Sequence, residues 1–461
     1  MYHNVVLLFI ACAAQFMVVL DVSAVNVALP SMRASLGFTD GGLHWVVNAY
    51  VLTFAGFLLA GGRAADLFGR KRVFRTGLAL FTAASLAGGL AGTDTVLVVA
   101  RAAQGLGAAA LAPATLTLLT ATHQEGPRRT RMLAVWAAVA MVAGASGSVV
   151  GGLLTDYLSW RWILLVNVPL GIAGLIAATR VLPDDERTER RRHLDLPGAA
   201  LATAGLAATT YGVSTIGTHG WATPLLIAGV GALAAFAVYE NRFARAPLIP
   251  SRLLRSRTVS LGNVVMFLTG ACLNPMWYFL TLYLQEVLHY GPLRAGLGFL
   301  PLAAVSAVVG ARVTPWLMRR ADSRLLIIAG AVAGCAGFVW QSAVTPQDGY
   351  ASGVLGPVLV LAVGLGLLNA PITATATAGV DRADAGAASG LMNTTKQVGG
   401  ALGLAGLIAV CGTSYTTAFL IMAALLAGTA VVATALPSTV HTRADVPSSR
   451  TLGERDATRP R

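Results

Sequence analysis

GGRAADLFGRK, residues 61–71, is a charged segment that follows a long apolar run, and GARVTPWLMRR, residues 310–320, repeats its pattern after another such run. Aligned without a gap, the segments share one glycine and three basic positions, namely Gly61, Arg63, Arg70 and Lys71 in the first and Gly310, Arg312, Arg319 and Arg320 in the second. A looser match joins GLGAAALAP, which follows Gln104, to GLGLLNAP, which begins at Gly364. The same order of features occurs twice, which indicates two related halves.

The rest of the chain is mostly apolar. Of its 461 residues, 56% are hydrophobic and 11% are charged, whereas soluble domains carry roughly a quarter charged residues. Runs near the length that spans a bilayer lie near 5–28, 42–62, 73–92, 95–120, 132–154, 161–182, 195–216, 223–239, 259–283, 293–313, 324–343, 353–376, 386–409 and 415–436. We therefore predict an all-α polytopic membrane protein with fourteen transmembrane helices, as two six-helix bundles plus two extra central helices.

Basic residues indicate the orientation of these helices. The formal net charge is +13, and nearly every arginine falls in the loops that follow even-numbered runs. Because cytoplasmic loops are enriched in Lys and Arg, we expect both termini in the cytoplasm. The basic residues are divided among separate loops, which argues against a nucleic-acid partner.

The expected organisation has four parts. These are an N-terminal six-helix bundle (1–182), two linker transmembrane helices with cytoplasmic loops (183–258), a C-terminal six-helix bundle (259–437) and a disordered cytoplasmic tail (438–461). The first apolar run is too long for a signal peptide and is expected to be the first span. The four cysteines lie in apolar runs at unrelated spacings, so we expect no disulfide and no metal site.

Six short motifs carry a family resemblance. They are LDVSAVNVALP (20–30), GRAADLFGRKR (62–72), RAAQGLGAA (101–109), GASGSVVGG (144–152), LSWRWILLVNVPLG (158–171) and YLQEVLHYGPLRAGLGFLP (283–301). Together they resemble the major facilitator superfamily, and within it the fourteen-span drug:proton antiporters. The resemblance implies a monomer in the bacterial cytoplasmic membrane that exports amphipathic, mostly hydrophobic small molecules such as antibiotics in exchange for protons, with no cofactor. Arg- and Ala-rich, Lys-poor usage suggests an antibiotic-producing actinomycete, and hence self-resistance.

Two of these motifs imply specific roles. The loop motif implies gating between the halves by Asp66, Gly69, Arg70 and Lys71. The antiporter motif comprises Gly147, Ser148, Gly151 and Gly152, with Ser148 where the motif usually has proline. The simpler alternatives are a basic loop that only sets topology and glycines that only let helices pack closely.

Asp21 is the one acidic residue in the first apolar run. It precedes Pro30 by nine residues, or about 13 Å along a helix, and Arg101 lies at a similar depth in the fourth run. We hypothesise that the two side chains approach each other. Burial disfavours a charged carboxyl group and a nearby guanidinium favours it, so Asp21 is a candidate for proton coupling, with Arg101 as its partner. The alternative is a static ion pair, although intramembrane acids are usually functional.

Polar residues inside the apolar runs are candidates for lining a substrate cavity. In the first half they are Asn26, Asn48 and Tyr50, and in the second half Asn274, Trp277, Tyr278, Asn369, Asn393, Lys396 and Gln397. Lys396 either faces this cavity or extends toward the cytoplasmic interface. Hydrogen bonding between helices is the alternative for each Asn.

Other functional classes receive little support. There is no GxxxxGK[ST] motif, so ATP is not the expected energy source, and the histidines are scattered, so no enzyme is predicted. Two alternatives to export remain, a uniporter or importer of a polar solute and a non-transporting membrane sensor. The first should need more hydrogen-bonding groups in its central helices, and the second should carry a soluble domain.

Overall fold

The structure is a computed structural model of the chain and describes residues 2–39, 42–121, 127–182, 196–216, 219–243, 251–345, 347–376, 378, 380, 385–412 and 414–437. The described residues form helices joined by turns and short loops, with no β-strand among them. The all-α prediction is therefore confirmed for this part of the chain.

The first half and the two linker helices have these bounds: α1 (Tyr2–Leu36), α2 (Trp45–Phe68), α3 (Arg70–Gly89), α4 (Asp94–Ala121), α5 (Pro127–Tyr157), α6 (Arg161–Leu165), α7 (Asn167–Val181), α8 (Leu196–Ser214) and α9 (Ala222–Arg242). The second half contains α10 (Ser251–Arg255), α11 (Arg257–Leu282), η1 (Tyr283–Val287), α12 (Pro292–Gly298), α13 (Leu300–Val308), η2 (Val309–Val313), α14 (Thr314–Met318), α15 (Ser323–Ser342), η3 (Tyr350–Val354), α16 (Leu355–Ala376), α17 (Ala385–Cys411) and α18 (Tyr415–Thr434).

Each of the fourteen apolar runs falls on a helix or on consecutive helical segments. Within the described residues, ten helical segments are long and apolar enough to cross a membrane, and α2 contributes a shorter apolar stretch, Trp45–Leu58. Two runs are interrupted, at Val166 between α6 and α7 and at Phe299 between α12 and α13. Pro169 and Pro301 follow these breaks closely, and proline removes a backbone donor that the preceding turn would use.

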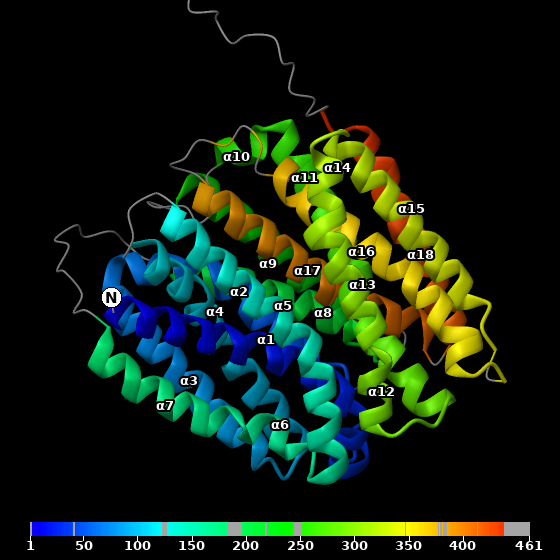
Figure 1. Cartoon of the computed structure of the whole chain (residues 1–461), viewed down its shortest axis with the longest axis horizontal. Coiled ribbons are helices and arrows are strands. Elements are labelled where there is room, and N and C mark those ends of the chain that lie inside the picture. Colours follow the sequence, from blue (N-terminus) through cyan, green and yellow to red (C-terminus); the bar gives the residue numbers. More distant parts are fainter. Residues whose placement is uncertain are drawn as a thin grey trace, which may run out of the picture.

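Most of the larger helix–helix contacts lie within one half of the chain. In the first half α2 and α3 pack on α4, α1 packs on α5, and α3 packs on α7. In the second half α11 packs on α17 and α18, and α15 packs on α16 and α18. Figure 1 shows the blue and cyan helices of the first half toward the lower left and most of the yellow to red helices of the second half toward the right, while α17 crosses the middle beside α2.

The linker helices α8 and α9 pack on each other, and α8 also packs against α2 and α17. The approach of α8 to α2 is close, because a Cβ atom added to Gly56 would lie 1.9 Å from Oγ1 of Thr203. Since α2 belongs to the first half and α17 to the second, α8 covers one of the seams along which the halves meet.

Candidate functional site

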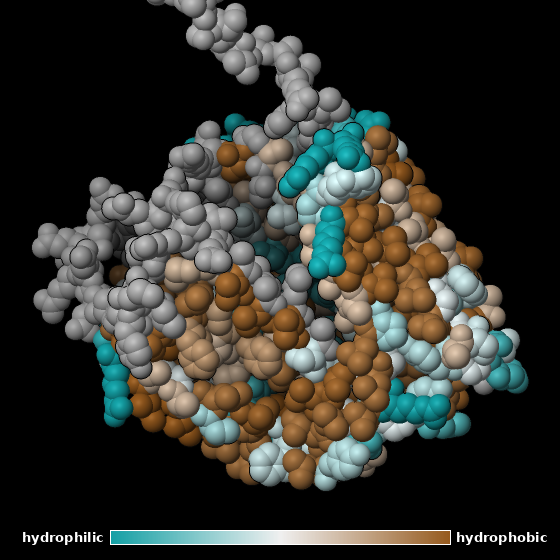
Figure 2. All heavy atoms as spheres, viewed as in Figure 1, coloured by the Kyte–Doolittle hydropathy of each residue, from teal (hydrophilic) through white to brown (hydrophobic). Residues whose placement is uncertain are grey.

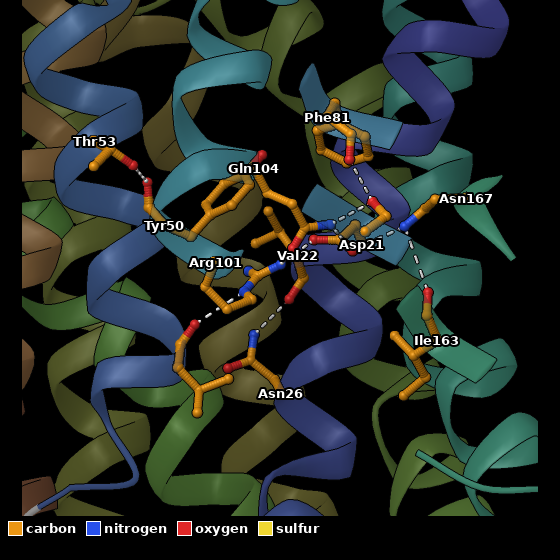
Figure 3. A network of polar contacts seen from close by, with 12 residues as sticks. Asp21, Val22, Asn26, Tyr50, Thr53, Phe81, Arg101, Gln104, Ile163 and Asn167 are labelled. Atoms are coloured by element: carbon orange, nitrogen blue, oxygen red, sulfur yellow. Dashed lines mark hydrogen bonds and ion pairs between the residues drawn. The ribbon is translucent and has the colours of Figure 1, made fainter. Parts of the chain in front are cut away.

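The Asp21 carboxylate lies at the centre of a buried polar network formed by α1, α4 and α7. Its side chain is 0% exposed, and Nη1 of Arg101 donates to its Oδ2 at 2.5 Å. Arg101 is also buried, and its Nε donates to the carbonyl of Val46 at 3.0 Å. Figure 3 shows the two side chains pointing toward each other from α1 and α4. The structure thus brings together the pair that sequence analysis expected to meet.

Two neutral amides complete this network, and sequence analysis missed both. Asn167 on α7 donates to Oδ1 of Asp21 at 3.0 Å, and Gln104 donates to the same oxygen at 3.3 Å. Gln104 also accepts from Arg101 at 2.8 Å and donates to Ser85 at 2.7 Å. Gln104 follows Arg101 by three residues, a spacing that places both on one helix face. This spacing could have identified Gln104 from the sequence.

Tyr50 on α2 covers the other side of the guanidinium. The Arg101 guanidinium carbon lies 4.5 Å from the centre of the Tyr50 ring, within cation–π range. Arg101 therefore has partners that do not depend on Asp21, whereas the carboxylate depends on Arg101, Gln104 and Asn167. An ionised carboxylate can accept from all three donors, while a protonated one gives up part of that capacity.

Four of the proposed cavity residues are buried in this conformation. Asn26 is buried and donates to the carbonyl of Val22 in its own helix at 2.9 Å. Asn48 is buried and points to the second half, donating to the carbonyl of Ala401 at 3.4 Å. Tyr50 and Tyr278 are also buried. The amide of Asn26 therefore bonds within its own helix, and the amide of Asn48 bonds to α17.

The remaining candidates lie on α11, α16 and α17. Asn369 and Asn393 are exposed, and each donates to the carbonyl four residues before it. Asn274 donates to Gln397 across the α11–α17 contact at 3.4 Å. Trp277, on the same side of α11 as Asn274, packs on Phe299 with ring centres 5.0 Å apart. Lys396 is partly exposed.

The two halves are tightly joined at one end, which we call the closed end. There Arg33 near the C-terminus of α1 forms an ion pair with Glu286, which also accepts from Tyr415 at 2.9 Å. Gln285 donates to the carbonyl of Val27 at 2.7 Å. We refer to Arg33, Glu286 and Tyr415 as the closed-end cluster, because it ties α1 to η1 and α18.

Away from the closed end, exposed residues mark a hollow between the halves. On α16, Asn369 and Thr373 are exposed, and on α17 so are Ser389 and Asn393. These positions lie toward the end of the molecule at which α1 begins. Figure 2 shows a hollow near the middle of this view with polar residues at its depth. Among the described residues, polar side chains are thus exposed toward one end of the molecule, while contacts between the halves close the other end.

The loop motif lies between α2 and α3. Gly69 has φ +95°, a backbone conformation that side-chain-bearing residues rarely adopt, so the turn requires glycine. Arg70 is exposed and begins α3, and Lys71 is partly exposed. Asp66 lies in the last turn of α2, but its side chain falls outside the described residues. Its gating role stays a prediction.

The antiporter motif on α5 makes close backbone contacts on two sides. A Cβ atom on Gly147 would lie 2.6 Å from the Cβ of Ser23, and one on Gly151 would lie 2.7 Å from the Cα of Ala24. On the other side, a Cβ atom on Gly152 would lie 2.8 Å from the Cα of Leu293 in α12. Ser148 is buried, and its carbonyl lies against Gly296. The motif therefore joins α1 to α5 and α5 to the second half.

Replacing Gly151 with valine should separate α1 from α5, because the new side chain would overlap the backbone of Ala24. We expect a destabilisation of about 1–3 kcal/mol, as for other overpacked sites. Thermal unfolding followed by fluorescence-detected size exclusion would measure it. Gly231→Val is the matched control, since nothing lies within 4 Å of a Cβ there. Equal stability of the two variants would contradict the close contact.

Comparison with known proteins places this geometry in a family. A family model described as Major Facilitator Superfamily matches residues 11–404. The chain belongs to the major facilitator superfamily. As a member of this superfamily it is a multi-pass membrane transporter and not an enzyme, as the motifs implied.

Similar superfamily members come from actinomycetes. The chain is 52% identical to a cephamycin export protein, CmcT, of Amycolatopsis lactamdurans, over 94% of this chain and 92% of that protein. It is 41% identical to a puromycin resistance protein of Streptomyces alboniger, over 90% of this chain and 82% of that protein. It is 36% identical to a lincomycin resistance protein of Streptomyces lincolnensis, over 87% of this chain and 83% of that protein.

Solved structures agree with the superfamily fold. A peptide transporter aligns with a TM-score of 0.68 at 15% identity, covering 93% of each chain. The nucleoside transporter NupG aligns with a TM-score of 0.65 at 13% identity, covering 93% of this chain and 99% of that one. At such low identity these likenesses concern the fold alone.

Proposed function

We propose that this superfamily member exports amphipathic small molecules, antibiotics among them, from the cytoplasm in exchange for protons. The observation that carries proton coupling is Asp21, a fully buried carboxylate whose donors come from two other helices. Its protonation would weaken the attraction that joins α1 to α4. Relatives named for cephamycin export and for puromycin or lincomycin resistance support export of antibiotics, with self-resistance as its role.

The proposal includes a topology. We place the chain in the bacterial cytoplasmic membrane as a monomer of fourteen spans, with both termini in the cytoplasm. The bundles comprise residues 1–182 and 259–437, joined by a two-helix linker at 183–258 and followed by a tail at 438–461. The arrangement is supported by the fourteen apolar runs, ten of which form helical segments long and apolar enough to cross a membrane among the described residues, and by the division of arginine among alternate loops. The driving force is the proton gradient, without a cofactor.

Alternating access then follows from the two ends of the molecule. With the N-terminus inside, the closed end faces outward and the hollow opens to the cytoplasm. The closed-end cluster would hold this inward-open state, and rocking of the halves would break it. Asp21 is fully buried in this inward-open state, so its proton exchange would require the rearrangement that rocking of the halves brings.

Replacing Glu286 with glutamine should loosen the outer end, because it removes one charge from the pair with Arg33. A partly exposed ion pair contributes up to about 1 kcal/mol, so the outward-open population should rise about two- to fivefold. The measurement is labelling of Asn26→Cys by an impermeant maleimide from outside, in a chain whose four native cysteines are replaced. Asp94→Asn, which removes an exposed acid at the start of α4, is the control. An unchanged labelling rate with Glu286→Gln would refute the assignment.

A susceptibility panel tests the function as a whole. An efflux-deficient host expressing the chain should tolerate several structurally unrelated antibiotics and dyes better than the host alone. Accumulation assays should show lower cellular drug content that rises when the proton gradient is collapsed. No resistance to any compound, with uptake of a sugar or amino acid instead, would favour the importer.

A further inference from the structure

We infer that Lys396 on α17 forms an anion subsite in the cavity, which binds a carboxylate or similar anionic group of the transported molecule. The inference rests on the proposed export function and names a class of substrate for it.

The depth of Lys396 excludes a residue that simply reaches the membrane surface. It lies eleven residues beyond the first residue of α17, or about 16 Å along the helix axis. This distance exceeds the length of a lysine side chain, so the ammonium group stays at the level of the helix interior. An intramembrane cation at such a depth usually has a functional partner.

Lys396 lies on the side of α17 that also carries two exposed polar residues. Ser389 and Asn393 precede it at spacings of seven and three residues, which place all three on one side of the helix. Both Ser389 and Asn393 are exposed, and Lys396 is partly exposed. Thr394, on another side of α17, donates to the carbonyl of Ala55 in α2 at 3.4 Å. The backbone at Lys396 lies against Gly270 of α11, which fixes the start of its side chain.

Lys396 forms no ion pair with any described residue. The buried acid of the first half, Asp21, is held by Arg101, Gln104 and Asn167. An ammonium group taken out of water without a counter-charge is unfavourable. A bound anion would supply the missing charge, so binding should be stronger for a substrate that brings one.

The neighbours of Lys396 fit an amphipathic anion. Gln397 accepts from Asn274 at 3.4 Å, which leaves its own amide hydrogens available as further donors. Trp277, one turn along α11 from Asn274, is partly exposed and packs on Phe299. The subsite thus combines a cation, neutral donors and aromatic surface, the combination by which pockets orient ligands with a single charged group.

The test compares two probes that differ only in charge. N-dansyl-phenylalanine carries a free carboxylate, and its methyl ester does not. Binding of each to the purified chain in lipid nanodiscs is followed by fluorescence anisotropy. The carboxylate should bind the parent chain about tenfold more tightly than the ester, and Lys396→Gln should remove that difference, about 1.4 kcal/mol.

Two variants separate the charge from other effects. Lys396→Arg keeps the charge and should retain the preference, while Arg242→Gln removes an exposed charge from α9 and should change neither probe. Unchanged ester binding in Lys396→Gln shows that the variant is folded. The inference is overturned if the parent does not bind the carboxylate, binds both probes equally, or loses both equally on Lys396→Gln.

Failure of the anion subsite can be distinguished from failure of the export proposal. A parent chain that confers no resistance refutes export itself. A parent chain that exports drugs but shows no preference for the carboxylate refutes only the anion subsite.

Discussion

Replacing Asp21 with asparagine will reduce resistance to that of the host without the transporter. The amide cannot ionise, so it cannot carry a proton between the two sides of the membrane. The variant also leaves the buried Arg101 guanidinium without its counter-charge, which is destabilising. Gln104, the carbonyl of Val46 and the Tyr50 ring partly offset this cost, so transport is compared at matched amounts of folded protein. Drug uptake into everted membrane vesicles with an imposed pH gradient would measure the loss.

Downhill exchange of drug should persist in Asp21→Asn, because substrate binding and rocking of the halves do not require the carboxylate. This distinguishes a coupling role from a static ion pair, whose loss would affect both modes alike. Asp94→Asn, which removes an exposed acid at the start of α4, is the control and should retain full resistance. Gradient-driven export by Asp21→Asn at the parent rate would refute the role of Asp21.

Replacing Arg101 with glutamine will have the larger effect on stability. It leaves the carboxylate of Asp21 fully buried with only the amide donors of Gln104 and Asn167. Removing one partner of a buried ion pair costs about 3–5 kcal/mol, a large share of the stability of a typical protein. We expect low yield and a clearly lower Tm in fluorescence-detected size exclusion.

The double variant Asp21→Asn with Arg101→Gln tests this explanation. It removes both charges, so it should recover most of the stability lost in Arg101→Gln alone, although it should not transport against a gradient. If the double variant is less stable than Arg101→Gln, the loss does not arise from the uncompensated carboxylate.

Sequence reasoning placed the helices well because each apolar run is long and the loops are marked by arginine. It could not place the interruptions as firmly, since a proline such as Pro169 or Pro301 can begin a helix or break one. The extra central helices were the least distinct runs. The packing of α8 on α2 and α17 is a tertiary contact that no local pattern encodes.

The site was predictable where a charge stood out. Asp21 and Arg101 are rare charges in apolar runs, and the helical rise alone gave them similar depths. Gln104 and Asn167 were missed because neutral amides in apolar runs also serve ordinary packing. Asn26 was proposed for the cavity, yet its amide forms a hydrogen bond within its own helix. Helix rotation decides such cases, and sequence periodicity is weak in helices that are apolar on every side.

Proton movement driven by drug is the most direct measure of the central claim, that Asp21 carries the coupled proton. The chain would be reconstituted in proteoliposomes containing a pH-sensitive dye, with the drug to which it gives the strongest resistance supplied on one side. The account predicts a pH change that depends on drug in the parent chain and none in Asp21→Asn. A drug-driven pH change of parental size in Asp21→Asn would contradict it.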